Sequence, residues 1–394
     1  MLERSRNQEF STYLGIEPGD IRDRPVLQDS MEQVEAETGE VYVIVYVVAR
    51  DQQLELILVP SSGLPKRYTI PGATRAEVLS TIRDLQIKIT SQRERRTTRY
   101  QEPAQRLYEW ILEPIEADLE EFGATTLLFS LGQGLRSLPI ATLWDGDRHL
   151  IEKYNYSLIP STSLIDIKHV PADKIEVLAM GASVFEDQAP LPAVPTEVKT
   201  ITNLWPGRSF LNESFTLENL RVQRRVTEYE IIHLATHADF QPGVSENSYI
   251  QLWDGRLPMD QLPSLNWDQP PVELLVLSAC RTAIGDQNAE LGFAGLAVQA
   301  GVKSAIASLW YVNDQSTLAL MSEFYNDLQT APIKAVALRE AQLAMLGGKV
   351  EIESGQLRTE DGLIPLPPEL ANLESEDFIH PYYWSGFTLI GAPW

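Results

Sequence analysis

The sequence predicts an α/β protein in which helices cover a mostly parallel sheet. The clearest sign is the second half of the chain, where apolar runs typical of buried strands alternate with helical patterns. A second sign is that two of these runs lead directly to His237 and to the only cysteine, Cys280. A third is the composition, because 44% hydrophobic and 8% aromatic residues are typical of a globular chain.

The first part of the chain shows strand and helix patterns of mixed order. Residues 1–40 are polar and acidic with weak periodicity, and they are interpreted as a lead-in segment. A hairpin follows, because two apolar runs flank the polar turn 50–53. A later helix is predicted from apolar residues at helical spacing, which are Leu107, Ile111, Leu112, Ile115 and Leu119. The expected elements are strands 41–49 and 54–59, helices 74–94 and 103–122, strand 125–131 and a closing segment at 154–163.

Two features of this part resemble binding motifs, but a structural role explains each of them. Gly132 and Gly134 follow a strand, yet the spacings of dinucleotide-binding loops and P-loops are absent, so we expect a turn. The stretch 91–99 is strongly basic and is interpreted as a solvated helix end and loop. Its basic residues are Arg93, Arg95, Arg96 and Arg99.

A polar stretch at 166–174 is the expected boundary between a unit at 41–170 and a second unit at 171–394. Beyond it, strands and helices alternate, which favours a parallel sheet. The expected elements are strand 175–180, a helix from about 196, helix 217–226, strands 231–236, 249–253 and 272–279, helix 291–300, strand 304–310, helices 314–328 and 332–346, and a last strand within 382–390. Residues 347–376 are rich in Gly, Pro and acids, and we expect a surface loop.

The formal charge of −23, from 55 acidic and 32 basic residues, disfavours direct binding to nucleic acid. A basic peptide or protein segment is the better expectation for a partner. One cysteine excludes an internal disulfide and a cysteine-based zinc site. The first residues lack the apolar core of a signal peptide, and no run approaches the roughly 18 apolar residues of a membrane span. A cytoplasmic protein without membrane contact is therefore expected.

His237 and Cys280 could meet at one edge of the sheet, because parallel strands carry ligand sites at their carboxyl ends. An imidazole beside a thiol can take its proton and later protonate a leaving amine. Backbone N–H groups of Ala238 and Cys280, expected in turns after the strands, could stabilise an oxyanion. The simpler alternatives are an inert buried thiol and a capping or core histidine. His233 would lie about 13 Å from His237 along a strand, which indicates packing or support and excludes a metal clamp.

The sequence resembles the CHAT domain, a caspase-like cysteine peptidase module related to separase and metacaspases. Five motifs occur in the family's order across residues 230–391, and weaker matches extend back to about residue 40. The motifs are Ile232-His233-Leu234-Ala235-Thr236-His237, Leu275-Val276-Leu277-Ser278-Ala279-Cys280-Arg281-Thr282-Ala283, Leu291-Gly292-Phe293-Ala294-Gly295-Leu296-Ala297, Ala307-Ser308-Leu309-Trp310-Tyr311-Val312-Asn313-Asp314 and His380-Pro381-Tyr382-Tyr383-Trp384-Ser385-Gly386-Phe387.

This resemblance implies a catalytic dyad of His237 and Cys280 in a caspase-like three-layer α/β sandwich. It also implies that residues 41–170 could be a non-catalytic, pseudo-caspase half, because they contain no cysteine. CHAT modules often follow TPR repeats, and none occurs here, so the chain could be part of a longer protein. A regulatory TPR region or another activator protein is therefore an expected partner. No cofactor and no metal site are expected.

The expected substrate-binding residues follow from the same resemblance. Asp314 would supply the acidic S1 pocket, although capping of the following helix would also explain it. Asp239 and Glu290 are lesser candidates, and solvated loop acids are their alternative. The strand edge at Ser308 and Trp310 would receive the substrate backbone, and Trp310 would wall the pocket unless it is a core residue.

The function expected from these residues is a cysteine endopeptidase that cleaves protein substrates after Arg or Lys. Two departures from the clan matter: Ala238 stands where glycine is usual, and no acid precedes Cys280. An alanine amide can still donate a hydrogen bond. The alternatives are a catalytically silent caspase-like scaffold that binds a partner and a peptide ligase on the same dyad.

Overall fold

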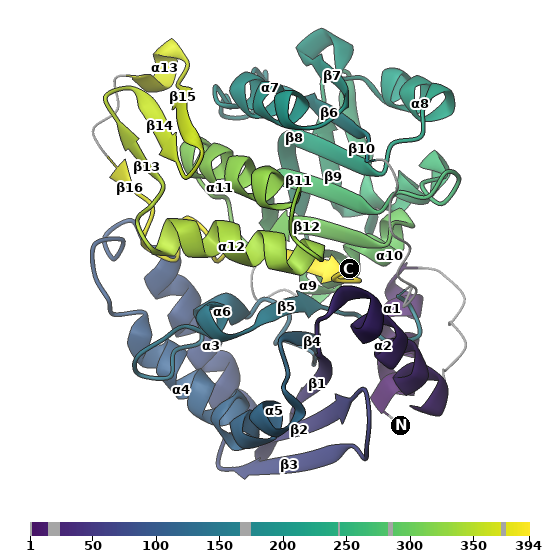
Figure 1. The fold of residues 1–394 in the computed structure, drawn as a ribbon, viewed down its shortest axis with the longest axis vertical. Helices are drawn as coiled ribbons and strands as arrows, with labels where there is room; N and C mark the ends of the chain where they lie inside the picture. Colours follow the sequence, from purple (N-terminus) through teal and green to yellow (C-terminus); the bar gives the residue numbers. More distant parts are fainter. Residues whose placement is uncertain (1, 15–23, 166–174, 243–244, 283–286, 372–375) are drawn as a thin grey trace.

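The computed structural model describes residues 2–14, 24–165, 175–242, 245–282, 287–371 and 376–394. They form two α/β halves on one sheet, with the C-terminal strand in the middle of the molecule (Figure 1). The strands of the first half are β1 (Tyr42–Ala49), β2 (Gln53–Pro60), β3 (Lys66–Pro71), β4 (Thr126–Leu131) and β5 (Asn155–Leu158). The second half contributes β6 (Val177–Gly181), β7 (Gly207–Leu211), β8 (Ile231–Phe240), β9 (Tyr249–Leu252), β10 (Gly255–Pro258), β11 (Leu274–Thr282), β12 (Ser304–Ser308) and β17 (Phe387–Gly391).

The strand order within the described residues is β10-β9-β8-β11-β12-β17-β5-β4-β1-β2-β3, and β6 pairs with both β7 and β8. The centre of the sheet is mostly parallel, as the alternation of strands and helices predicts. Strand β17 joins the halves, because it runs antiparallel to β12 and parallel to β5. The units expected at 41–170 and 171–394 therefore share one sheet, and the boundary expected at 166–174 lies outside the described residues.

The first half confirms the predicted hairpin of β1 and β2 and extends it by β3. Its helices are α1 (Leu2–Leu14), α2 (Arg24–Thr38), α3 (Arg75–Thr90), α4 (Gln101–Ile111), α5 (Glu116–Phe122) and α6 (Leu150–Lys153). The lead-in segment is thus largely helical. The helix predicted at 103–122 is interrupted by a short 3₁₀ turn at Glu113–Ile115, because Pro114 lacks the N–H that a continuous helix needs.

The second half places helices on both sides of its strands. Its helices are α7 (Val194–Leu204), α8 (Leu217–Val226), α9 (Gln287–Ala294), α10 (Leu296–Ala300), α11 (Asp314–Asp327), α12 (Lys334–Leu346) and α13 (Pro368–Ala371). Helices α7 and α11 pack together on one side, and α9 and α10 lie against β8, β11 and β12 on the other (Figure 1). The predicted helix 291–300 is divided at Gly295.

The surface loop predicted at 347–376 is wrong. This segment forms a small antiparallel sheet of β13 (Glu351–Glu353), β14 (Gln356–Thr359), β15 (Gly362–Pro365) and β16 (Glu376–Asp377). Its apolar residues Val350, Ile352 and Leu357 are buried, and the Glu360 N–H donates to the carboxylate of Glu323 in α11 at 3.0 Å. Strands this short contain too few residues to show an alternating pattern.

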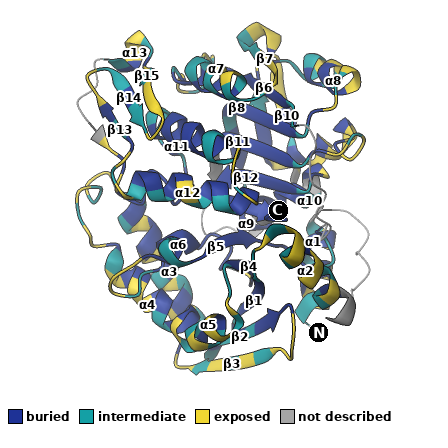
Figure 2. Ribbon diagram, in the orientation of Figure 1, coloured by how far each residue is buried: buried dark blue, intermediate teal, exposed yellow. Residues whose placement is uncertain are grey.

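The strands of the main sheet are buried along most of their length, whereas the outer faces of the helices and strand β3 are exposed (Figure 2). The main hydrophobic core runs through both halves. None of the described helices is long and apolar enough to cross a membrane.

Candidate active site

The two residues of the predicted dyad lie on neighbouring parallel strands. His237 pairs with Ala279, and Ala238 pairs with Cys280, in the ladder between β8 and β11. The register shifts just before these pairs, because Leu234 still faces Leu277. Two residues of β8 therefore lie opposite one residue of β11, which is a β-bulge, a device that re-aims side chains and is common beside active sites.

Both strands are longer than the sequence predicted. Strand β8 continues to Phe240 and β11 to Thr282, so His237 and Cys280 lie within strands rather than at their ends. The turns expected at Ala238 and Cys280 are therefore wrong, and Ala238 also pairs with Ile250 of β9 on its other side. The strands continue past His237 and Cys280 because they pair with neighbouring strands. The apolar pattern of a single strand does not show where such pairing ends. The side chain of Cys280 lies outside what the structure describes.

His237 is half-buried and is held by the loop that follows β6. Its Nε2 lies 2.8 Å from the carbonyl oxygen of Ala189. Because a carbonyl only accepts hydrogen bonds, Nε2 carries a proton, and in the neutral ring Nδ1 is left as the basic atom. The Phe185 ring packs 4.7 Å from the imidazole and the Tyr311 ring 5.9 Å from it, between centroids.

This loop belongs to the site for a topological reason. In the sheet, β6 lies between β7 and β8. The chain runs from β6 to β7 on one side, and then through helix α8 to β8 on the other side of β6. In open α/β sheets, ligands bind at such switch points, beyond the carboxyl ends of the strands. The loop after β6 and His237 of β8 meet there.

Asp314 is at the start of α11, but it does not cap that helix. The cap is Asn313, whose side chain accepts a hydrogen bond from the Ser316 N–H at 2.9 Å. Asp314 Oδ2 instead accepts from the N–H of Ala193 at 2.5 Å, at the first turn of α7. Burial raises the pKa of the Asp314 carboxyl to about 7, the Ala193 hydrogen bond opposes this shift, and the charge of Glu197 adds to it.

His233 has the supporting role that its position in the strand indicates. Its Nε2 lies 2.7 Å from Glu197 Oε1 in α7, and its Nδ1 lies 3.1 Å from the hydroxyl of Tyr325 in α11. His233 and Glu197 are almost fully buried. This pair fastens α7 and α11 to β8, four residues before His237.

Ser308 is the last residue of β12, and Trp310 follows it. Strand β12 runs between β11 and β17, but its ladder with β11 spans only Ser304 to Ile306, whereas its ladder with β17 reaches Ser308. Substrate addition along this stretch therefore stays a prediction. Trp310 is buried, and its indole N–H donates to the Tyr382 carbonyl at 3.0 Å. A Cβ on Gly386 would come within 3.0 Å of this ring, which explains the glycine in the motif that follows Tyr382.

The two lesser acidic candidates lie in different places. Asp239 is buried at the end of β8 and accepts from the Gln241 side chain at 3.0 Å. Glu290 is buried in α9, where its carboxylate accepts from the Ser137 hydroxyl of the first half at 2.6 Å. Asp239 is therefore two residues from His237, whereas Glu290 bridges the two halves.

Sequence reasoning missed the residues that hold His237 and Asp314. Phe185, Ala189 and Ala193 belong to the loop after β6, and Tyr311 follows β12. The loop has no chemical motif of its own. The only usable signal was its position after a strand that ends in Gly181 and Ala182, next to the His237 strand.

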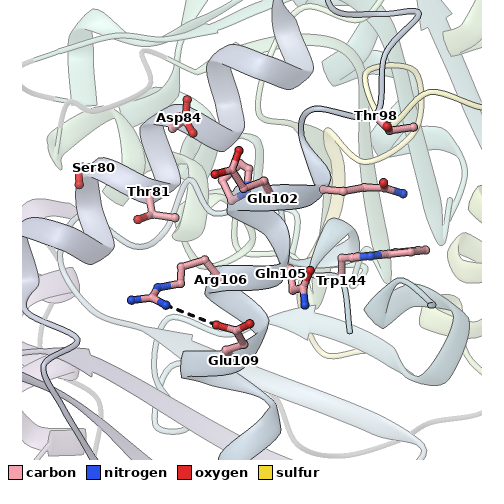
Figure 3. Close-up of a pocket in the computed structure, with 11 residues that line it drawn as sticks. Ser80, Thr81, Asp84, Thr98, Glu102, Gln105, Arg106, Glu109 and Trp144 are labelled. Carbon is pink, nitrogen blue, oxygen red and sulfur yellow. Dashed lines mark ion pairs between the residues drawn. The ribbon is translucent and has the colours of Figure 1, made fainter. Parts of the chain in front are cut away.

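A cavity of about 910 Å³ lies away from these residues. It is formed in the first half, mainly by α3 and α4 with Trp144 (Figure 3). Arg106 and Glu109 form an ion pair at 3.6 Å on its wall. None of the candidate site residues lines it. Within the described ranges, no three His, Cys, Asp or Glu residues are grouped so that they could hold a metal ion.

The fold is mixed α/β with a large, mostly parallel sheet, and it resembles the fold of separase. Residues 101–392 match the family model described as CHAT domain, and the chain belongs to that family. No curated protein sequence matches the chain significantly.

Among solved structures, chains of the Saccharomyces cerevisiae separase–securin complex are similar in fold. The 3.0 Å structure matches with a TM-score of 0.54 and 9% identity, covering 93% of this chain and 31% of the other. The 2.6 Å structure matches with a TM-score of 0.49, 9% identity and the same coverage. This chain thus spans about a third of the length of the chains it matches.

Proposed function

We propose that this chain is a cysteine endopeptidase in which His237 and Cys280 form the catalytic dyad. The observation that carries the proposal is their placement near the carboxyl ends of adjacent parallel strands. One position of offset between neighbouring strands corresponds to about 6 Å between Cα atoms, and in a regular ladder it turns the two side chains to opposite faces of the sheet. Proton exchange between the imidazole and the thiol therefore requires the chain after Ala279 to leave the regular ladder.

In this proposal, His237 Nδ1 takes the proton from the Cys280 thiol, and the thiolate attacks the carbonyl carbon of the scissile peptide bond. The imidazolium then protonates the leaving amine, and water hydrolyses the thioester that remains. The Ala189 carbonyl supports the imidazole, because it fixes the Nε2 proton and thereby the tautomer. The N–H groups of Ala238 and Cys280 are the candidate oxyanion donors.

Cleavage after Arg or Lys is the specificity that we propose, with Asp314 as the acid that binds the substrate cation. Its Oδ2 is held by the Ala193 N–H beside the loop that carries Ala189, which brings the carboxylate into the same loop system as His237. A cationic substrate side chain would lower the raised pKa of Asp314 by pairing with it. Trp310 and Ser308, one strand away, would border the substrate, and Asp239 is the secondary acidic candidate.

Regulation by a protein partner is part of the proposal. Ala238 lies between β9 and β11 in the sheet. Its N–H must therefore leave the ladder before it can donate a hydrogen bond to an oxyanion. An enzyme that needs such a rearrangement is latent until an activator, such as a TPR region, binds. The fold relatives were solved with securin, which agrees with protein control of this fold. A cytoplasmic setting completes the proposal, because a free thiol stays reduced there.

The test is cleavage of a positional peptide library by the wild-type chain and by Cys280→Ala. Cleavage after Arg or Lys that disappears in the variant is the expected result. Full cleavage by Cys280→Ala would refute the proposal.

The same ladder also favours a second candidate, a catalytically silent scaffold that binds a partner. Iodoacetamide separates the two when neither protein cleaves. Rapid alkylation of Cys280 indicates a latent enzyme, and resistance indicates a scaffold.

A further inference from the structure

A second cavity, of about 730 Å³, lies directly beside the candidate active site. One wall is the loop after β6, from Val184 to Gln188, and the other is the hairpin of β9 and β10, from Gln251 to Arg256. Both walls start from strands that pair with β8, on the edge opposite β11. The cavity therefore opens at the same switch point of the sheet as His237.

The cavity and the imidazole share a residue. Phe185 lines the cavity and packs 4.7 Å from the His237 ring, between centroids. On the other wall, the carbonyl of Gln251 accepts from the Thr236 hydroxyl at 2.6 Å, one residue before His237. A peptide that reaches the imidazole therefore has this cavity immediately next to it.

The lining of the cavity combines negative charge with exposed apolar surface. Glu186, Asp187 and Asp254 contribute three exposed carboxylates. Arg256 is the one cationic residue in the lining. Its guanidinium is stacked over the Tyr249 ring of the same hairpin, at 4.2 Å from the ring centroid. Trp253 is 39% exposed on one wall and Val184 is 58% exposed on the other, so the lining also presents apolar surface. The cavity thus offers carboxylates and an apolar surface together.

We propose that this cavity is an extended subsite that binds a substrate segment in which a basic residue lies next to an aliphatic or aromatic one. The inference rests on the proposed peptidase function and deepens it. The carboxylates of Glu186 and Asp187 pair with the basic side chain, and Trp253 packs against its apolar neighbour. Charge complementarity here sets which protein is cut, whereas Asp314 sets the residue after which it is cut.

The test compares two substrates, a single-arginine reporter amide and a long peptide that adds Lys-Leu pairs on both sides of the same arginine. The variants are Glu186→Gln with Asp187→Asn, and separately Trp253→Ala. The matched control is Glu353→Gln with Glu369→Gln, which removes two exposed carboxylates, one from β13 and one from α13. We expect each cavity variant to lose about tenfold in kcat/KM on the long peptide and almost nothing on the reporter. Equal losses on both substrates, or a long peptide cut no better than the reporter by wild type, would overturn the subsite.

Binding separates the subsite from the proposed peptidase activity. The fluorescent long peptide is titrated into Cys280→Ala and into the same variant with Glu186→Gln and Asp187→Asn. A weakening of about tenfold supports the subsite even where no cleavage is observed, so that only the peptidase proposal fails. Equal affinity of the two proteins for this peptide, or equal affinity for a version with Glu in place of Lys, contradicts the subsite.

Discussion

Cys280 pairs with Ala238 in the parallel ladder between β11 and β8, one position beyond the pairing of Ala279 with His237. This register puts the only cysteine of the chain on the strand next to that of a histidine whose Nε2 proton is fixed by a carbonyl. In the neutral ring the other nitrogen, Nδ1, is then the basic atom. The account therefore predicts a reactive thiol rather than an inert one.

Alkylation of Cys280 tests this reactivity without a substrate. We expect iodoacetamide to react with the wild-type protein at pH 7 about tenfold faster than with His237→Ala, because an imidazole partner lowers the pKa of a thiol below its usual value of about 8.5. The measurement is intact mass against time over a range of pH. A rate that is the same in both proteins, and equal to that of the urea-unfolded chain, would show that His237 does not activate the thiol.

The pH dependence of cleavage tests Asp314. Its pKa of about 7 means that the carboxylate forms only as the pH rises through that value. We expect kcat/KM for an arginine substrate to increase between about pH 6 and pH 8, mainly through KM, because the ionised form binds the cation. Asp314→Asn should lower kcat/KM about a hundredfold and remove the increase. Asp260→Asn, an exposed acid elsewhere, is the control, and an unchanged pH profile in Asp314→Asn would exclude the role.

The raised pKa of Asp314 also makes the free energy of unfolding depend on pH in a defined direction. Its folded pKa lies above the ordinary value of 3.8, so the native chain retains a proton that the unfolded chain loses. The contribution of Asp314 to the free energy of unfolding is therefore fully present below about pH 4 and is lost as the pH rises to about 7. Urea unfolding should show that Asp314→Asn is more stable relative to wild type at pH 8 than at pH 5. The opposite trend would mean that Asp314 is stabilised as the anion.

The buried contact between His233 and Glu197 predicts coupled stability. Removal of one partner leaves the other buried without its hydrogen bond, so Glu197→Ala and His233→Ala should each cost about 3 kcal/mol. The double variant should cost clearly less than the sum, because the two residues contact each other. Denaturant unfolding of the four proteins measures this coupling, with Glu218→Ala in α8 as control. Strict additivity would contradict the contact.

Helix α1 should support the segment that follows Cys280. Phe10 is fully buried against Leu291 of α9, and a Cβ on Gly295, between α9 and α10, would come within 3.2 Å of its ring. Phe10→Ala should destabilise the chain by about 3 kcal/mol and make α1 sensitive to limited proteolysis. Gly295→Ala should be less harmful in the Phe10→Ala background than in wild type, because the added Cβ then meets the Leu291 carbonyl oxygen, at 3.0 Å, but no longer the ring. Equal effects in both backgrounds would show that the glycine is needed for another reason.

Local patterns predicted much of the fold. The hairpin of β1 and β2, helix α8 and the strands that carry His237 and Cys280 were correct, because each is a long run with clear periodicity. The lengths of β8 and β11 were not, since polar residues such as Asp239 continue the ladder through pairing with neighbouring strands. The small sheet at 351–377 was missed for the same reason: its strands depend on partners rather than on a pattern of their own.

The candidate site, like the fold, was predicted only in part. His237 and Cys280 carry chemistry that a sequence displays, and their strand positions could be predicted. The bond from the Ala193 N–H to Asp314 joins residues 121 positions apart, and the contact of Phe10 with Leu291 joins α1 to α9, so no local pattern contains them. Such contacts follow from the topology of the sheet, which determines the loops that meet at His237.

The most direct measurement is covalent trapping with a peptidyl-arginine acyloxymethyl ketone, read by intact mass. Because the chain has one cysteine, a single added mass that is absent in Cys280→Ala identifies the nucleophile. We predict one label per chain on Cys280, much slower labelling in His237→Ala, and little labelling by the matching peptidyl-aspartate compound. The contradicting result is a protein in which iodoacetamide alkylates Cys280 but the arginine compound never labels it. Cys280 would then be accessible without being the nucleophile of a peptidase specific for basic residues.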